Sequence, residues 1–180
     1  MEHGTVRGEI LKDVSMKRYT SMRVGGTASF LVYPRDEEDV ATAIRWLRRE
    51  GLPARFLGNG TNVVVADRGI PAGLIRVTRM RHCRSVATEG GALVEASGGL
   101  SLKTLIQECC RRGFSGLEKL YGIPGTVGGA LKMNAGSFGV SVTDHLKDVR
   151  LIAGDGSIRT LTKDEMRFGY RMSWRVQGQS

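Results

Sequence analysis

The segment from Gly122 to Gly136, GIPGTVGGALKMNAG, constrains the fold more than any other part of this chain. It holds five glycines, yet most of its other residues are apolar, whereas a flexible glycine-rich linker is polar. Gly128 and Gly129 fall inside a helical pattern, where each glycine costs roughly 1 kcal/mol relative to alanine. We therefore expect the missing Cβ atoms to let this backbone pack closely against a sheet or a flat ligand.

The same segment predicts the ends of a helix. Pro124 and Thr126 suit its start, and Gly136 suits its end. A helix N-terminus that follows a glycine turn presents free N–H groups and the positive end of the helix dipole. The start of this helix is therefore a candidate anion site.

A second glycine loop, Leu57-Gly-Asn-Gly-Thr-Asn62, lies upstream and precedes Val63–Val65. Gly58 and Gly60 can adopt positive φ, and asparagine tolerates it better than most residues. Successive backbone N–H groups in such a turn can converge into an anion-binding nest. An ordinary turn between two strands is the alternative.

Bulk composition limits the remaining choices. The 180 residues fit one domain or two small lobes, and 41% hydrophobic residues suffice for a core. No apolar run approaches membrane-spanning length, and MEHGTVRGEI lacks the apolar region of a secretory signal, so we expect a cytoplasmic protein without a membrane contact. The cysteines Cys83, Cys109 and Cys110 form no CxxC pair, so we expect reduced structural thiols and no metal site.

The net charge of +9 raises nucleic-acid binding as an alternative function. However, only 6% of the residues are aromatic, and the chain contains no recognised nucleic-acid motif. A positive field would equally gather anionic small molecules, and a solvated basic surface explains most of the arginines. We therefore expect no nucleic-acid partner.

The first lobe, residues 1–80, reads as a small β-α-β unit with extra strands. Asp36 is placed to cap a helix that Gly51 ends. Strands are predicted at 28–33, 54–57, 63–65 and 74–77.

The second lobe, residues 81–180, reads as two hairpins around a helix and the glycine-rich segment. Ser101 is placed to cap the helix, which Gly113 closes, and Thr162 with Glu165 predicts a capping box for a further short helix. The hairpins are predicted from 85–88 with 92–96 and from 149–153 with 157–161.

Five motifs carry a family resemblance by their order along the chain. They are TSMRVGG at 20–26, LGNGTN at 57–62, GLE at 116–118, GIPGTVGGALKMNAG at 122–136 and FGYR at 168–171. The chain from about residue 19 to 173 strongly resembles the UDP-N-acetylenolpyruvoylglucosamine reductase (UDP-N-acetylmuramate dehydrogenase) family. The resemblance implies an α+β fold: a two-lobed FAD-binding module of the PCMH (vanillyl-alcohol-oxidase-like) type, with one glycine segment on each side of a cleft. A dinucleotide-binding parallel sheet is not expected, since no G-x-G-x-x-G follows the first strand.

The family's function would make the chain part of a flavin-dependent oxidoreductase. NADPH would reduce FAD, which would then reduce UDP-N-acetylenolpyruvoylglucosamine to UDP-N-acetylmuramate in peptidoglycan synthesis, a pathway of cell wall biogenesis, cell shape and cell division. The family holds FAD without a covalent bond. This suits the chain, because His3, His82 and His145 all lie outside the glycine segments.

The resemblance also implies site residues. Arg171 would be catalytic, stabilising the enol-type intermediate, and Tyr170 would bind substrate. A fixed guanidinium lowers the barrier to building negative charge. The cofactor-binding residues would be Gly58, Asn59, Gly60, Thr61, Asn62, Gly122, Ile123, Pro124, Gly125, Thr126, Gly128, Asn134, Ala135 and Gly136.

The family continues into a C-terminal substrate domain that carries a proton donor, and nothing in residues 172–180 resembles that domain. Three explanations stay open: a truncated chain, a split enzyme whose other half is a separate chain, or a flavin-binding remnant. The alternative function is accordingly a flavin-binding module without turnover of its own.

Overall fold

The computed structural model describes residues 5–169 and 172–173. These residues form two compact units. The first comprises the described residues up to Met80 together with Ile152–Ile158, and the second comprises Arg81–Leu151 and the described residues from Arg159 onward. The expected second lobe, 81–180, therefore differs from the second unit in one segment. Residues 152–158 belong to the first unit, where Ile152 packs against the core beneath a helix.

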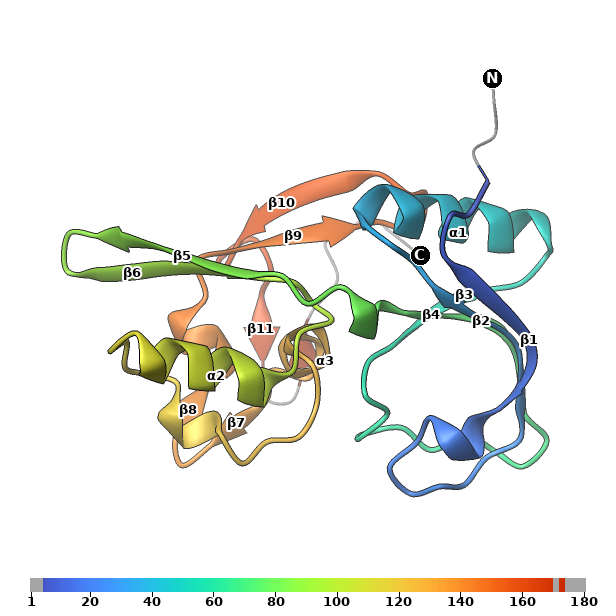
Figure 1. The fold of residues 1–180 in the computed structure, drawn as a ribbon, viewed down its shortest axis with the longest axis horizontal. Coiled ribbons are helices and arrows are strands. Elements are labelled where there is room, and N and C mark those ends of the chain that lie inside the picture. The colour runs from blue at the N-terminus through green and yellow to red at the C-terminus, as the bar shows by residue number, and fades with distance from the viewer. Residues whose placement is uncertain (1–4, 170–171, 174–180) are drawn as a thin grey trace. The chain divides into compact units, whose positions relative to one another are not determined.

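A mixed four-stranded sheet organises the first unit (Figure 1). Its strand order is β1-β2-β4-β3, with β1 antiparallel to β2 and with β4 parallel to both β2 and β3. The bounds are β1 Glu9–Ser15, β2 Thr27–Tyr33, β3 Ala54–Leu57 and β4 Ile70–Arg76. The sequence analysis did not anticipate β1, because most of its side chains are exposed and it carries little apolar alternation.

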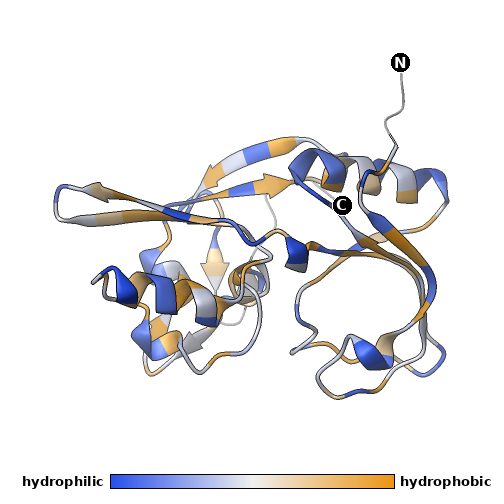
Figure 2. Ribbon diagram, in the orientation of Figure 1, coloured by the Kyte–Doolittle hydropathy of each residue, from blue (hydrophilic) through white to orange (hydrophobic). Residues whose placement is uncertain are grey.

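The helix α1 (Glu37–Arg49) covers one face of this sheet. As predicted, Asp36 caps it: the Asp36 carboxylate accepts a hydrogen bond from the Asp39 backbone N–H at 2.9 Å. Alternate strand residues serve two cores, since Val32 packs toward α1 while Leu31 packs on the opposite face with Met16. Figure 2 shows α1 alternating between polar and apolar residues, as expected for a helix that is buried on one side.

The prediction of a strand at 63–65 was wrong. These residues follow the glycine loop without joining the sheet, and Val64 is 70% exposed while Val65 is 8% exposed. The β-propensity of valine favours extended backbone, but a strand also needs a hydrogen-bonding neighbour. The parallel strand after the loop begins only at Ile70.

The second unit contains two helices and several two-stranded ladders around one core. Leu102, Ile106 and Leu120 are its most buried large side chains. The elements are β5 Cys83–Thr88, β6 Gly91–Ala96, α2 Leu102–Arg111, α3 Val127–Lys132, β7 Gly136–Ser137, β8 Val140–Ser141, β9 Asp148–Ile152, β10 Ile158–Thr162, β11 Phe168–Gly169 and β12 Met172–Ser173. The described residues also include the 3₁₀ helices η1 Met16–Arg18 and η2 Val77–Arg79 in the first unit and η3 Glu118–Leu120 and η4 Val142–His145 in the second. Over the described ranges, no helix combines the length and the apolarity that crossing a bilayer requires.

Both predicted hairpins are present, but three predicted helix ends need correction. Ser101 is the N-cap residue of α2, but its side chain makes no capping hydrogen bond, and its backbone forms a β-bridge with Thr126. The Thr162–Glu165 capping box forms, with the Glu165 carboxylate accepting from the Thr162 N–H at 2.7 Å, yet it closes a turn rather than a helix. The helix α3 ends at Lys132, so Gly136 does not end it and instead opens β7.

Candidate functional site: two glycine segments

The loop Gly58–Asn62 follows β3 at the carboxyl end of the two parallel pairs of the first unit. Gly60 has φ 69°, and its carbonyl accepts a hydrogen bond from the Ser21 N–H at 3.0 Å. A Cβ at Gly60 would lie 1.9 Å from the carbonyl oxygen of Tyr19. Gly60 is therefore required by the packing of the chain itself, whatever the loop binds.

Three backbone donors of this loop have no partner among the described residues. Among the residues that the structure describes, the N–H groups of Asn59, Gly60 and Asn62 donate to no protein acceptor. Asn59 and Asn62 are also exposed. Unpaired backbone donors seek an acceptor in solvent or in a ligand, and several in one turn suit an anion.

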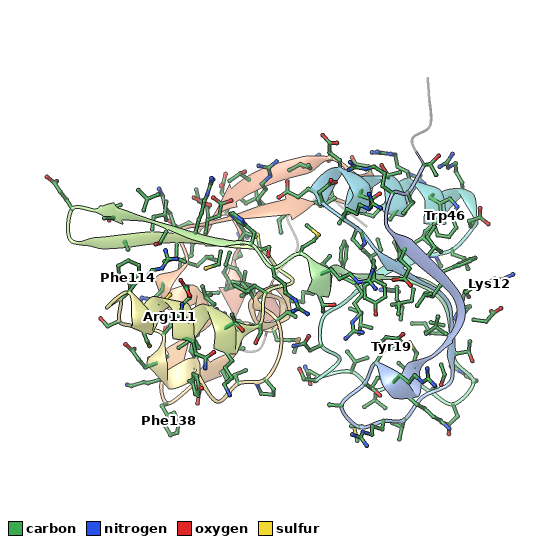
Figure 3. All side chains as sticks on the ribbon, viewed as in Figure 1. Lys12, Tyr19, Trp46, Arg111, Phe114 and Phe138 are labelled. Carbon is green, nitrogen blue, oxygen red and sulfur yellow. The ribbon has the colours of Figure 1, made fainter. Side chains whose placement is uncertain are left out.

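Arg76 and two tyrosines form a cluster next to this loop, which the sequence analysis did not anticipate. Arg76 pairs with Leu57 across β4 and β3, and its guanidinium stacks on the rings of Tyr19 and Tyr33 at 4.9 and 5.8 Å. Figure 3 shows Tyr19 on the side of the sheet opposite α1. Burial raises the pKa of Tyr19, as does the neighbouring Tyr33, while Arg76 lowers it.

Arg76 also donates to the Tyr33 hydroxyl at 3.0 Å. Its buried Nε finds no acceptor among the described side chains and backbone. The sequence alone does not show that Leu57 and Arg76 are neighbours, because parallel strands pair residues that are distant in sequence.

The start of α3 does not form the predicted anion site. Thr126 caps the helix as predicted, accepting from the Gly129 N–H at 3.3 Å. The N–H groups of Val127 and Gly128 donate to the carbonyls of Leu100 and Gly98 at 2.8 and 2.9 Å. These first N–H groups of the helix are thus satisfied by the protein, and the helix has only six residues. The start of α3 therefore has few free donors for an anion.

The helical glycine Gly128 packs against backbone, as expected, but its neighbour is a loop of the protein. A Cβ there would lie 3.0 Å from the carbonyl oxygen of Gly98, in the turn after β6. Gly122 differs, because a Cβ at that position would meet nothing within 4 Å. A ligand can therefore approach this segment at the exposed positions Gly122 and Pro124.

The last predicted cofactor residues of this segment are held by protein contacts. Ala135 is buried, and a Cβ on Gly136 would lie 3.1 Å from the Val140 carbonyl oxygen. The Asn134 side chain bonds to two other residues of the second unit. Tyr170 and Arg171, the predicted substrate-binding and catalytic residues, lie outside the described residues.

The cysteines are free thiols. Burial raises the pKa of Cys83 and of Cys109, which disfavours the reactive thiolate. No cluster of three or more metal-ligating side chains occurs within residues 5–169 and 172–173.

The α+β arrangement is shared with known flavoproteins. A VAO-type flavoprotein from Myceliophthora thermophila has a similar fold, with a TM-score of 0.60 at 13% identity over 76% of this chain and 26% of that one. At this identity the likeness concerns the fold alone. It confirms the predicted fold class, the FAD-binding module of the PCMH type.

Residues 28–162 match the family model described as "FAD binding domain". The chain belongs to this family. The family match therefore supports FAD, the cofactor that the motifs predicted.

The chain is similar to UDP-N-acetylenolpyruvoylglucosamine reductases. It is 38% identical to the enzyme of Syntrophus aciditrophicus over 92% of this chain and 54% of the relative. The crystal structure of the Thermus caldophilus reductase shares 36% identity and a TM-score of 0.71, over 93% of this chain and 56% of that one. The family resemblance read from the motifs is confirmed, and the chain spans about half the length of these relatives.

Proposed function

We propose that this chain is the flavin-binding part of a UDP-N-acetylenolpyruvoylglucosamine reductase and that it binds FAD without a covalent bond. The observation that carries the proposal is the loop Gly58–Asn62, whose open backbone donors suit a pyrophosphate. The similarity to reductases over 92% of the chain supports the substrate class, a UDP-sugar with an enolpyruvyl group.

The chain's residues would bind and orient the reactants. The loop N–H groups would hold the pyrophosphate, and Gly122, which has open space around it, would admit a flat ring. Bound FAD would supply the hydride for the enolpyruvyl double bond, with NADPH as its reductant. Arg171 would stabilise the negative charge that develops on the substrate, and Tyr170 would contact the substrate. Such a reaction belongs to peptidoglycan synthesis in the cytoplasm and requires no nucleic-acid partner.

Non-covalent binding predicts that acid precipitation of the flavin-loaded chain releases yellow FAD into the supernatant. The measurement is the visible spectrum of supernatant and pellet after reconstitution. Flavin that stays in the pellet would contradict non-covalent binding, and a chain that takes up no FAD would contradict the proposed function.

Asn62→Asp tests the pyrophosphate position. Asn62 is exposed, so the variant should fold normally, but its carboxylate would repel a diphosphate bound to the loop. We expect FAD affinity to fall by roughly tenfold at low salt and by less at high salt. Titration monitored by flavin fluorescence measures this, with Thr88→Asp at the exposed end of β5 as the charge-matched control. Equal affinities of the two variants would exclude the loop as the pyrophosphate site.

The alternative function is a flavin-binding module without turnover of its own. Product formation by the isolated chain with NADPH and the enolpyruvyl substrate separates the two functions. Turnover identifies a self-sufficient reductase, whereas FAD binding without product identifies the module.

A further inference from the structure

We propose that Asn134 is a positioning residue, whose side-chain amide fixes the strand that leads into Tyr170 and Arg171. The sequence analysis placed Asn134 among the residues that contact FAD. The structure shows that its amide bonds to two residues of the protein. A role of Asn134 in catalysis rests on the proposed function, but its hydrogen bond to Gly169 does not.

The backbone places Asn134 directly after the end of α3. Met133 is the C-cap, and Asn134 has φ 40°, in the left-handed region that asparagine tolerates. Its N–H donates to the Leu131 carbonyl at 3.1 Å, so this reversal of the chain is part of the helix end. The side chain is consequently anchored to the same short helix that Thr126 caps.

Both ends of the Asn134 amide are bonded. Its Nδ2 donates to the Gly169 carbonyl at 3.0 Å, and its Oδ1 accepts from the Thr143 hydroxyl at 2.8 Å. A carbonyl can only accept, so the Gly169 contact requires the amide nitrogen on that side and sets the orientation of the group. Thr143 is buried, at 3% exposed, so the acceptor side is held by a fixed partner.

The strand that receives this bond has little other structure of its own. The strands β11 and β12 have two residues each and pair only at Phe168–Ser173 and Gly169–Met172. Gly169 immediately precedes Tyr170 and Arg171 in sequence. A hydrogen bond to its carbonyl therefore ties the chain next to the predicted catalytic pair to the end of α3.

Asn134→Asp isolates the bond to Gly169. The aspartate keeps the size of the side chain, the tolerance of positive φ and an acceptor for Thr143, but an ionised carboxylate cannot donate to a carbonyl. Hydrogen–deuterium exchange of the flavin-free chain should accelerate roughly tenfold in peptides covering residues 166–173, the factor for loss of about 1.4 kcal/mol. Asn62→Asp is the control for the same chemical change, and it should leave these peptides unaffected.

Three further variants complete the test. Asn134→Gly removes the side chain while keeping the left-handed backbone, and should accelerate the same peptides. Thr143→Val should accelerate them less, and Thr143→Ser should restore parent exchange. At pH near 4, where the aspartate of Asn134→Asp begins to protonate and can donate again, the variant's exchange should approach that of the parent.

Two results would overturn the proposal: unchanged exchange of 166–173 in both Asn134 variants, or a uniform increase across both units. Weaker FAD binding by Asn134→Asp with unchanged exchange would assign the residue to the cofactor instead. If the parent chain binds no FAD, the proposed function fails, while the exchange comparison on the flavin-free chain still decides the role of Asn134.

Discussion

Gly60→Ala is expected to destabilise the first unit by about 2–5 kcal/mol, as measured by urea or thermal unfolding. One part is the cost of a side chain at φ 69°, about 1–2 kcal/mol. The larger part is steric, because the new Cβ would lie 1.9 Å from the Tyr19 carbonyl oxygen, and backbone has to move to admit it. The loop would be displaced from the segment that contains Ser21, whose N–H bonds to the Gly60 carbonyl.

Gly51→Ala is the matched control for this prediction. Gly51 has nearly the same φ, 71°, but a Cβ there would meet nothing within 4 Å. It should cost only the conformational part, about 1–2 kcal/mol. If Gly60→Ala were no more destabilising than Gly51→Ala, the result would contradict the close contact between residue 60 and the Tyr19 carbonyl. A substitution at Gly60 also cannot report cofactor affinity cleanly, since it alters the fold.

Asp39→Ala is expected to cost about 2–5 kcal/mol of unfolding free energy. Asp39 is 1% exposed, and its carboxylate accepts from the backbone N–H groups of Arg7 and Arg35 at 2.7 and 2.9 Å. Alanine would leave both donors without a partner, and each unsatisfied buried polar group costs about 1–3 kcal/mol. The bonds join the chain before β1 to the start of α1, so the loss should appear in the unfolding of the first unit.

Glu38→Ala provides the comparison, because Glu38 is an acidic residue in the same helical turn. Its side chain is 88% exposed and lies 4.0 Å from the Arg7 guanidinium. Exposed pairs of this kind contribute about 0–1 kcal/mol. A loss in Asp39→Ala as small as that in Glu38→Ala would contradict the bridging role of the buried carboxylate.

Local sequence determined the elements whose signals lie within a few residues. Asp36 was recognisable as the cap of α1, and Thr126 as the cap of α3, because a cap bonds to an N–H only three residues away. Motif order along the chain indicated the family and its cofactor, since binding loops are short contiguous segments. The same local logic failed at 63–65, where extended backbone without a neighbouring strand is not a strand.

Tertiary structure decided what each glycine and each polar group does. Gly60 is required by the Tyr19 carbonyl and Gly128 packs closely on the Gly98 backbone, and neither neighbour is close in sequence. The N–H groups at the start of α3 are bonded to Leu100 and Gly98, while those of Asn59, Gly60 and Asn62 have no acceptor among the described residues. Asn134 was recognisable as a residue of the glycine-rich motif, but only the fold shows that its amide bonds to Gly169. A hydrogen bond depends on which groups meet in space, and chain order does not determine that.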